Sequence, residues 1–376
     1  MHLIFYFIYR LMYCYKHHLR FTAQEDPWLC FKYYRESSAP NKKSMCQVLR
    51  ETDRLIKYWH RFPDTYFIFC HWLKEYNDWD CICSFLPQRN YSLALVGGVE
   101  LTPYKILIND KILCHELLSF YGIPVPRMLL VFRNGTFFIG NRIVLGEEVD
   151  RLFGETNDER LFVKLASEGA ARGVFVMRHT QGGYELDGEK VSAEFIRRRF
   201  EGKNIFIEPS LVQEPVLRGF NPDTVNTVRI LTLNDTNGNI SIVSAAVRFG
   251  RKGNFVDNMH AGGLAVSINL ETGEMEQYGA RRFEPVKYYE HPDSHLKFEG
   301  TKIPQWDEIV GIVNKSLAFL PSYRSVGFDI VTTEKGPLVL EINTGAGMDL
   351  AQVGKERGIA DAFDKYIKRH RLRVRA

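Results

Sequence analysis

The strongest pattern in the sequence lies in Gly327-Phe328-Asp329-Ile330 and in Leu338-Val339-Leu340-Glu341-Ile342-Asn343. Both stretches alternate apolar residues with acidic or amide residues, which predicts two β-strands with one polar face each. Glu341 and Asn343 are two residues apart and therefore share a face, while Ile330, Leu340 and Ile342 are expected on the other. A hairpin through residues 334–337 would place Asp329 alongside them. The sequence thus predicts an antiparallel strand pair that gathers three oxygen-bearing side chains.

These three side chains suit a metal ion. Asp329, Glu341 and Asn343 would supply hard oxygen donors of the kind that Mg²⁺ prefers, and would leave room for water and phosphate oxygens. The alternative interpretation is a strand pair whose polar residues face solvent. The spacing alone leaves both interpretations open.

A second pattern follows the predicted strand at residues 161–164. This strand ends in Lys164, a fixed positive charge, and is followed by small residues that include Ser167, Gly169 and Gly173. Such a loop allows backbone N–H groups to approach phosphates. Neither a Walker phosphate loop nor a dinucleotide-binding glycine pattern occurs in the chain. An ordinary β-turn is the alternative interpretation.

A third pattern is the predicted strand and connector at residues 211–216. Gln213, Glu214 and Val216 belong to it, and the backbone of such a connector can bind an adenine edge; a structural linker is the alternative. Polar residues then enter the apolar strands that follow, which predicts the wall of a cleft. They are Asn226, Arg229, Arg248, Asp257, Asn258 and His260.

The ordered succession of these patterns resembles the ATP-grasp superfamily, in particular the branch found with sugar-transfer and polysaccharide-assembly genes. The resemblance covers about residues 110–352. It rests on Asp110-Lys111 before a helix that stops at Gly122, Phe162-Val163-Lys164, Asn226–Arg229, Asp257-Asn258 with Gly262-Gly263, and the two strands that carry Asp329 and Glu341-Ile342-Asn343.

The resemblance implies ATP and Mg²⁺ as cofactors and an ATP-dependent carboxylate–amine ligase that forms an acyl phosphate. Lys111, Lys164, the loop from Ser167 through Gly169 to Gly173, and the hinge formed by Gln213, Glu214 and Val216 would bind ATP. Arg229 and Lys164 would act in catalysis, and Asp329, Glu341 and Asn343 would hold Mg²⁺. Asn226, Arg248, Asp257, Asn258 and His260 are expected to contact substrate. Ala170-Ala171-Arg172 stand where the family commonly has more glycine.

The expected fold class is α+β, an ATP-grasp fold with two α+β lobes that grip ATP and an N-terminal, mainly helical accessory domain. We expect the accessory domain at residues 1–109, the N-terminal lobe at 110–210, and the C-terminal lobe with the Mg²⁺ site at 211–376. Strands are predicted at about 128–132, 161–165, 173–177, 205–207, 227–233, 240–247, 263–268, 327–331 and 338–342. Helices are predicted at about 46–62, 110–121, 192–200, 306–320 and 359–369.

The composition narrows the classes of molecule that this chain is expected to bind and the compartment in which it is expected. A net charge of +4 over 376 residues does not indicate a nucleic-acid-binding protein. The seven cysteines show no regular spacing, which favours a reducing, cytoplasmic location. The apolar segment Met1–Tyr15 is too short to span a bilayer, and reads as a core helix or an interfacial anchor. The basic C-terminal tail, Lys368 to Arg375, reads as a solvated helix end or as a contact with a membrane surface.

Expected substrates are a small-molecule carboxylate and an amine or sugar-linked acceptor, with a sugar or polysaccharide precursor among the targets. The oligomeric state is not predicted. One rival function is a kinase on the same scaffold that phosphorylates a hydroxyl of a small molecule or sugar. Another is a non-catalytic partner in a glycan-assembly complex, although the complete set Asp329, Glu341 and Asn343 argues against it. A glycosyltransferase is suggested only by Asp78-Trp79-Asp80.

Overall fold

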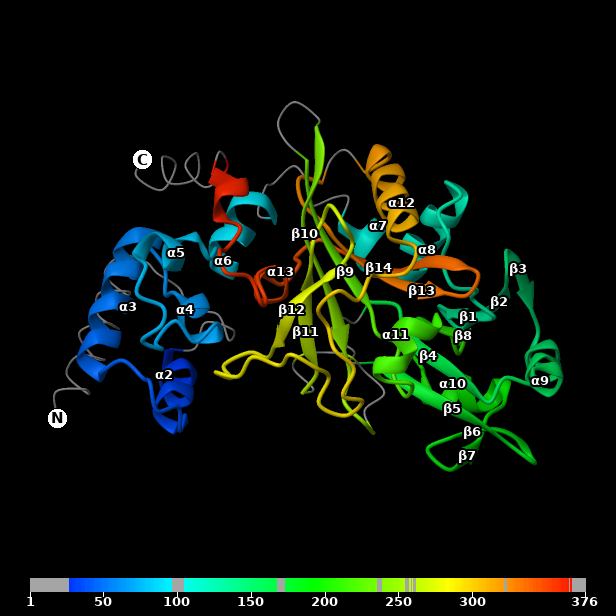
Figure 1. Cartoon of the computed structure of the whole chain (residues 1–376). Helices are drawn as coiled ribbons and strands as arrows, with labels where there is room; N and C mark the ends of the chain where they lie inside the picture. Colours follow the sequence, from blue (N-terminus) through cyan, green and yellow to red (C-terminus); the bar gives the residue numbers. More distant parts are fainter. Residues whose placement is uncertain are drawn as a thin grey trace.

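The computed structural model describes residues 27–96, 105–167, 173–234, 239–253, 257, 259, 262–320, 323–364 and 366. These residues form a group of short helices, a six-stranded antiparallel sheet and an eight-stranded antiparallel sheet (Figure 1). The predicted α+β class with an N-terminal helical region is therefore confirmed. Met1–Tyr15 and the basic tail lie outside the described residues. In the part of the chain that is described, no helix is long and apolar enough to cross a membrane.

The N-terminal helical unit, residues 27–96, contains α2 (Pro27–Glu36), α3 (Met45–Trp59), α4 (Asp64–Ile68), α5 (Trp79–Ser84), α6 (Gln88–Tyr91) and η2 (Ser92–Val96). The α3 helix begins after Ser44, whose hydroxyl accepts a hydrogen bond from the Gln47 backbone, and ends at the left-handed residue His60. The many aromatic residues of this unit pack against one another: the rings of Phe31 and Phe67, for example, lie 4.9 Å apart. They form the core of this unit.

The six-stranded sheet has the order β12-β11-β10-β9-β13-β14. Its strands are β9 (Val228–Asn234), β10 (Ile240–Phe249), β11 (Leu264–Ile268), β12 (Met275–Ala280), β13 (Gly327–Thr333) and β14 (Gly336–Asn343). Its apolar face packs against helices α7 (Lys105–Asn109), α8 (Lys111–Phe120), α11 (Pro215–Phe220) and α12 (Trp306–Ala318). The opposite face carries Arg229 and, further along β9, Leu231 and Leu233. These two leucines pack against the helical unit.

Helix α8 packs against both sheets. Asp110 caps this helix by accepting hydrogen bonds from the backbone of Ile112 and Leu113, both at 3.1 Å. Cys114 and Leu118 of the helix then enter the core of the six-stranded sheet. Ile112 of the same helix packs against Val131 and Phe206 of the eight-stranded sheet. Residues 105–109, expected in the accessory domain, and residues 110–120, expected in the N-terminal lobe, thus also contribute to the core of the six-stranded sheet.

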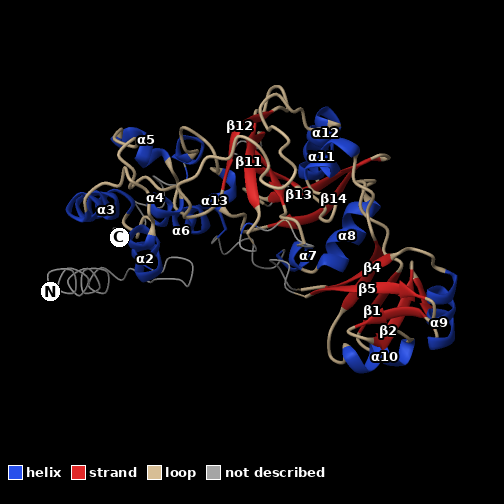
Figure 2. Cartoon of the chain, turned by 60° about the horizontal axis from the view of Figure 1, so that its bottom comes forward, coloured by secondary structure: helices blue, strands red, loops and turns tan. Residues whose placement is uncertain are grey.

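The eight-stranded sheet has the order β3-β2-β1-β8-β4-β5-β6-β7. Helices α9 (Gly146–Glu155) and α10 (Ala193–Arg199) cover one of its faces (Figure 2). The strands are β1 (Leu130–Arg133), β2 (Thr136–Ile139), β3 (Arg142–Val144), β4 (Arg160–Leu165), β5 (Val174–Thr180), β6 (Gly183–Leu186), β7 (Glu189–Lys190) and β8 (Ile205–Pro209). The nine strands predicted between residues 128–132 and 338–342 occur in the two sheets, whereas the strand predicted at 211–216 does not; β2, β3, β6, β7 and β12 were not predicted.

The end of the described chain returns to the helical unit, beside α5 and α6 (Figure 1). Both α13 (Met348–Ala351) and the 3₁₀ turn η5 (Ala360–Phe363) share its apolar core. The side chain of Gln352 is fully buried, accepts a hydrogen bond from the Leu86 backbone N–H at 2.7 Å and donates to the Leu86 carbonyl at 3.0 Å. The helix predicted at 359–369 appears as this 3₁₀ turn, and its remainder lies largely outside the described residues. The helical unit is thus fixed to the six-stranded sheet.

Gly358 lies at this junction, where its backbone N–H donates to the Ser84 hydroxyl at 2.7 Å. A Cβ atom at residue 358 would collide with the Ser84 carbonyl oxygen and with Phe85 Cα. Because backbone atoms cannot move aside cheaply, we expect Gly358→Ala to lower the free energy of unfolding by about 1–3 kcal/mol. Urea denaturation monitored by circular dichroism measures this change.

Gly311→Ala is the matched control. Gly311 lies in α12, where an added Cβ would meet no atom within 4 Å. Alanine in an open helix interior is expected to raise the free energy of unfolding by about 0.5–1 kcal/mol. Equal effects at the two positions would contradict the close approach at Gly358.

Candidate functional site

A cavity of about 480 Å³ lies between the two sheets. Its polar lining brings together residues that are far apart in the sequence: Lys111, Lys164, Glu208, Arg229, Arg248, Asp257, Asp329, Glu341 and Asn343. Its apolar lining includes Phe162, Val174, Phe206, Leu211, Val212 and Leu340. The charged residues can therefore bind charged groups of a ligand, and the apolar residues can pack against a flat ring.

Strand register explains how the charged wall forms. Asp329 on β13 stands directly opposite Arg229 on β9 and Glu341 on β14. Gly327, two residues before Asp329, is paired with Asn343. Residues that stand opposite each other on neighbouring strands point to the same face. Arg229, Asp329, Glu341 and Asn343 therefore occupy one face of the six-stranded sheet.

A β-bulge changes one expectation. Asp329 pairs with Glu341 but Ile330 pairs with Val339, so Leu340 is an extra residue in β14. The bulge interrupts the alternation, and Leu340 lines the same cavity as Glu341. The expectation that Leu340 faces away from Glu341 was wrong. A strict two-residue alternation cannot reveal such an inserted residue.

Asp329 is held by two arginines. Its carboxylate accepts hydrogen bonds from Nε and Nη2 of Arg229, the latter at 2.8 Å, and lies 3.3 Å from Nη2 of Arg248. Burial alone would raise the pKa of Asp329, but the charges of Arg229 and Arg248 outweigh it and lower this pKa below its usual range. Asp329 is therefore a carboxylate at neutral pH, and its side chain is 8% exposed.

The donor set around Asp329 fits a hard divalent cation. Glu341 Oε2 lies 3.7 Å from Lys111 Nζ, and Asn343 Nδ2 donates to Asp329 Oδ2 at 3.4 Å. Two carboxylates and an amide on one face leave coordination positions for water and phosphate oxygens. Over the described residues, no group of three or more His, Cys, Asp or Glu side chains could hold a metal by itself. A cation at Asp329 would thus need ligand oxygens from a bound molecule.

The eight-stranded sheet contributes Lys164 through the alternation of β4. Leu161, Val163 and Leu165 face the core, so Phe162 and Lys164 face the cavity. The same alternation in β8 sends Phe206 and Glu208 into the cavity.

Glu208 was not predicted. It is 4% exposed, and its Oε2 accepts a hydrogen bond from Lys164 Nζ at 2.5 Å. His115 Nε2 lies 3.7 Å from its other carboxylate oxygen, and burial lowers the pKa of His115. Glu208 therefore fixes the position of Lys164, and the alternation of β8 was the signal that could have identified it.

The connector after β8 differs from the expected strand at 211–216. It forms one isolated bridge, between Gln213 and Thr333, before α11 begins at Pro215. Pro209 to Gln213 line the cavity, whereas Glu214 and Val216 do not. Glu214 instead caps α11 by accepting a hydrogen bond from the Val216 backbone at 2.9 Å. The connector thus meets the cavity a few residues earlier than predicted.

Asn226 does not line the cavity. Its side chain is fully buried, and its Nδ2 donates to the carbonyls of Leu217 at 2.9 Å and Asn221 at 3.1 Å. Its backbone N–H donates to Gln213 Oε1 at 3.0 Å. These bonds hold the connector to β9, so the expected substrate contact of Asn226 is replaced by a supporting role.

Arg248 and Asp257 line the cavity together, with Arg248 Nε 3.3 Å from Asp257 Oδ2. Burial raises the pKa of Asp257, and Arg248 partly offsets this effect.

Asn258, His260 and Gly169 lie outside the described residues. Ser167 is exposed at the end of β4, and Gly173 precedes β5 with φ of +84°, where a Cβ would approach Leu165 Cδ1 at 2.6 Å.

Comparison with known proteins identifies the family to which this chain belongs. Residues 101–367 match the family described as sugar-transfer associated ATP-grasp. A probable alpha-L-glutamate ligase of Syntrophotalea carbinolica is 24% identical over 263 residues, which cover 70% of this chain and 64% of that protein. The ribosomal protein bS6–L-glutamate ligase of Escherichia coli is 26% identical over 203 residues, 54% of this chain and 52% of the ligase. The chain thus spans only about half to two thirds of these relatives.

Among solved structures, the D-alanyl-alanine synthetase A of Vibrio cholerae is similar with 13% sequence identity and a TM-score of 0.41. The match covers 70% of this chain and 65% of the synthetase. The VanG D-Ala:D-Ser ligase of Enterococcus faecalis has 14% identity and the same TM-score of 0.41, with coverage of 69% of this chain and 61% of the ligase.

Proposed function

Since the chain belongs to the sugar-transfer associated ATP-grasp family, we propose that it is an ADP-forming carboxylate–amine ligase that works through an acyl phosphate. One observation carries the proposal: the cavity that Asp329 and Glu341 line is also lined by six cationic side chains, which are Lys111, Arg160, Lys164, Arg218, Arg229 and Arg248. Bringing a carboxylate to a triphosphate opposes like charges, and preorganised cations overcome that repulsion.

ATP would bind with its adenine against the apolar wall formed by Phe206, Leu340 and the connector at 209–213, and with its phosphates toward Lys164. Bound at Asp329, Glu341 and Asn343, Mg²⁺ would neutralise phosphate charge and polarise the γ-phosphoryl group. Glu208 orients Lys164 for this contact, since it holds the ammonium group from the buried side.

The reaction needs no protein nucleophile. An oxygen of the substrate carboxylate attacks the γ-phosphorus, the bond to the β,γ-bridging oxygen breaks, and ADP leaves with that electron pair. The amine then attacks the acyl carbon, loses a proton, and expels inorganic phosphate. Arg229 and Arg248 line the place where negative charge develops, and each such contact typically contributes about 3 kcal/mol to the transition state.

The named relatives support a ligase, because both are called glutamate ligases. The family description supports a sugar or polysaccharide precursor as the molecule that is modified. We also propose a cytoplasmic location, where ATP is available.

Hydroxylamine trapping tests the acyl phosphate directly. The full chain is incubated with MgATP, a pool of carboxylates and hydroxylamine in place of the amine. A ligase is expected to yield a hydroxamate together with ADP and phosphate, because hydroxylamine attacks acyl phosphates. A parallel reaction contains a pool of sugars in place of the carboxylates. A kinase would give a phosphate ester in that reaction and no hydroxamate in the first, and that outcome would replace the ligase by the rival function.

A further inference from the structure

Glu208 and Lys164 form a close ion pair in the wall of the cavity that is proposed to bind ATP. Glu208 is buried, and its Oε2 accepts a hydrogen bond from Lys164 Nζ at 2.5 Å. In the proposed reaction, Lys164 must also bind a nucleotide phosphate. An ammonium group that turns toward this phosphate leaves Glu208 as a buried carboxylate with less of its compensating charge, which is unfavourable. A second partner for Glu208 would offset this loss.

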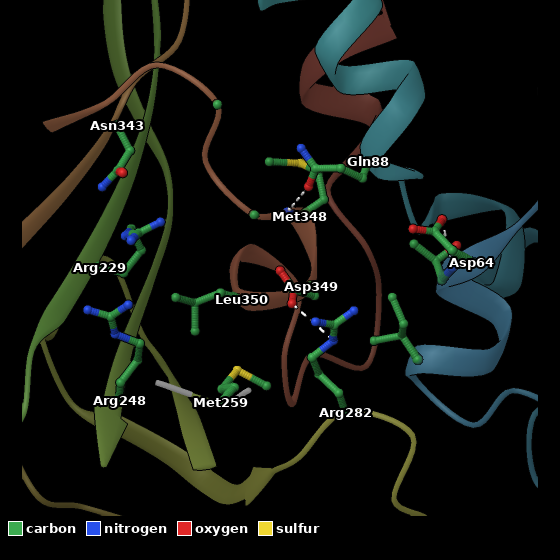
Figure 3. A pocket seen from close by; sticks show the side chains of 14 residues that line it. Asp64, Gln88, Arg229, Arg248, Met259, Arg282, Asn343, Met348, Asp349 and Leu350 are labelled. Carbon is green, nitrogen blue, oxygen red and sulfur yellow. Dashed lines mark hydrogen bonds and ion pairs between the residues drawn. The ribbon is translucent and has the colours of Figure 1, made fainter. Parts of the chain in front are cut away.

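Asp329 in the same cavity shows how such a second partner works. Its carboxylate contacts both Arg229 and Arg248, which lie next to each other on the six-stranded sheet (Figure 3). Either arginine can therefore turn toward a ligand while the other remains with Asp329. At Glu208 the second basic side chain is a histidine, since His115 Nε2 lies 3.7 Å from Glu208 Oε1.

His115 is held in a form that cannot donate a hydrogen bond to Glu208. Burial lowers the pKa of His115, so its ring is neutral at pH 7. The Pro126 carbonyl accepts a hydrogen bond from the ring, and Nε2 has no hydrogen-bond partner in the described part of the chain, so the bond comes from Nδ1. A neutral ring with its proton on Nδ1 has only a lone pair at Nε2. Donation to Glu208 thus requires a second ring proton.

The charges around His115 couple this second proton to Lys164. Glu208 of β8 raises the pKa of His115, whereas Lys164 of β4 lowers it. The other titratable groups of α8 and its N-cap are paired, exposed or, for the thiol, kept protonated by burial; they are Asp110, Lys111, Glu116 and Cys114. A change in the charge that Lys164 presents to Glu208 therefore acts directly on His115.

Resting on the nucleotide site proposed above, we propose that His115 is a positioning residue that takes a proton from solvent and donates a hydrogen bond to Glu208 when Lys164 binds a nucleotide phosphate. Nucleotide binding then replaces the Glu208–Lys164 pair by a Glu208–His115 pair, and the ammonium group turns to the phosphate. His115 does not line the cavity, so it acts through Glu208 and does not touch the nucleotide. Departure of the nucleotide reverses the exchange and returns the proton to solvent.

Calorimetric titration of the full chain with MgADP tests this proposal. Titrations at pH 7 in buffers with different heats of ionisation give the number of protons that bind together with MgADP. We expect about half a proton or more per MgADP, because a carboxylate that loses its cation raises the pKa of a neighbouring histidine by about 1–3. The affinity for MgADP should then fall by about threefold for each pH unit near pH 7. MgADP binding without proton uptake overturns the proposal.

His115→Gln identifies the group that takes up the proton. Glutamine can donate an N–H to Glu208 at every pH but does not titrate. We expect this variant to bind MgADP with an affinity within about threefold of that of the unmodified protein at pH 7, and without proton uptake. His179→Gln is the matched control, because His179 is exposed on β5 and does not line the cavity; the uptake should stay unchanged. Uptake that persists in folded His115→Gln overturns the proposal.

His115→Leu separates positioning from a purely structural role. Leucine fills space but cannot donate to Glu208, so Lys164 remains with the carboxylate. We expect the affinity for MgADP to be about tenfold or more below that of His115→Gln, because a hydrogen bond to a charged group is lost. Equal affinities of the two folded variants overturn the proposal.

Glu208→Gln serves if substitutions at His115 prevent folding. It removes the charge that binds the second proton, so the uptake is expected to disappear, and uptake that persists overturns the proposal. The nucleotide site itself is tested separately in the same titrations. Unmodified protein that binds no MgADP contradicts the site proposed for ATP, whereas binding without uptake contradicts only the role of His115.

Discussion

Glu341→Gln is expected to lower MgATP turnover by about a thousandfold or more, because it removes a charge from a metal-binding set without changing its shape. Glu341 shares one sheet face with Asp329 and lies 3.7 Å from Lys111. Glutamine retains a single neutral oxygen donor, which binds Mg²⁺ more weakly than a carboxylate does. ADP release measured against Mg²⁺ concentration should show both a lower rate and a higher Mg²⁺ requirement.

Glu334→Gln is the matched control for this prediction. Glu334 is exposed in the turn of the same hairpin and does not line the cavity. Its substitution should leave turnover within about twofold of the unmodified protein, since isolated surface charges contribute little. Turnover of Glu341→Gln within tenfold of the unmodified protein would remove Glu341 from the metal site.

Arg229→Met is expected to affect both stability and activity. It removes the guanidinium that holds Asp329 and leaves a buried carboxylate with the more distant Arg248. Breaking one side of a buried ion pair typically costs about 3–5 kcal/mol of unfolding free energy. Turnover should also fall by about 10²–10³, because a cation is lost beside the transferred phosphoryl group. Urea denaturation and ADP release measure the two effects.

Arg251→Met provides the comparison on the surface. Arg251 makes the same two-bond contact, with Asp293 at 2.8 and 2.9 Å, but in a partly exposed position. An exposed pair of this kind contributes about 1 kcal/mol or less. Equal destabilisation by the two substitutions would show that burial of the Arg229–Asp329 pair has no energetic consequence.

The sequence predicts the elements whose pattern is local. The β4, β9, β13 and β14 strands alternate or run apolar for several residues, so both their existence and the cavity-facing side of Lys164 and Asp329 follow from periodicity. The unpredicted strands are short: β7 consists of Glu189 and Lys190, both exposed, and carries no hydrophobic pattern at all. Its pairing comes from the hairpin with β6, not from its own residues.

Features that depend on distant contacts could not be predicted. The bulge at Leu340 exists only relative to β13, and the burial of Asn226 depends on Gln213. The attachment of α8 to the six-stranded sheet likewise comes from packing between residues far apart in the chain. The same holds for the helical unit, whose core includes Leu231 and Phe363. Residues of the helical unit also line a cavity beside the six-stranded sheet, and the sequence did not predict this contact.

The most direct test of the proposed ligase is the product balance of ATP turnover by the full chain. MgATP is supplied with carboxylates and amines, separately and together, and also with a pool of sugars, and ADP, AMP, phosphate and phosphate esters are quantified. The account predicts that ADP and phosphate form in equal amounts only when a carboxylate and an amine are both present. Formation of AMP, or of ADP together with a phosphorylated alcohol and no need for an amine, would contradict it.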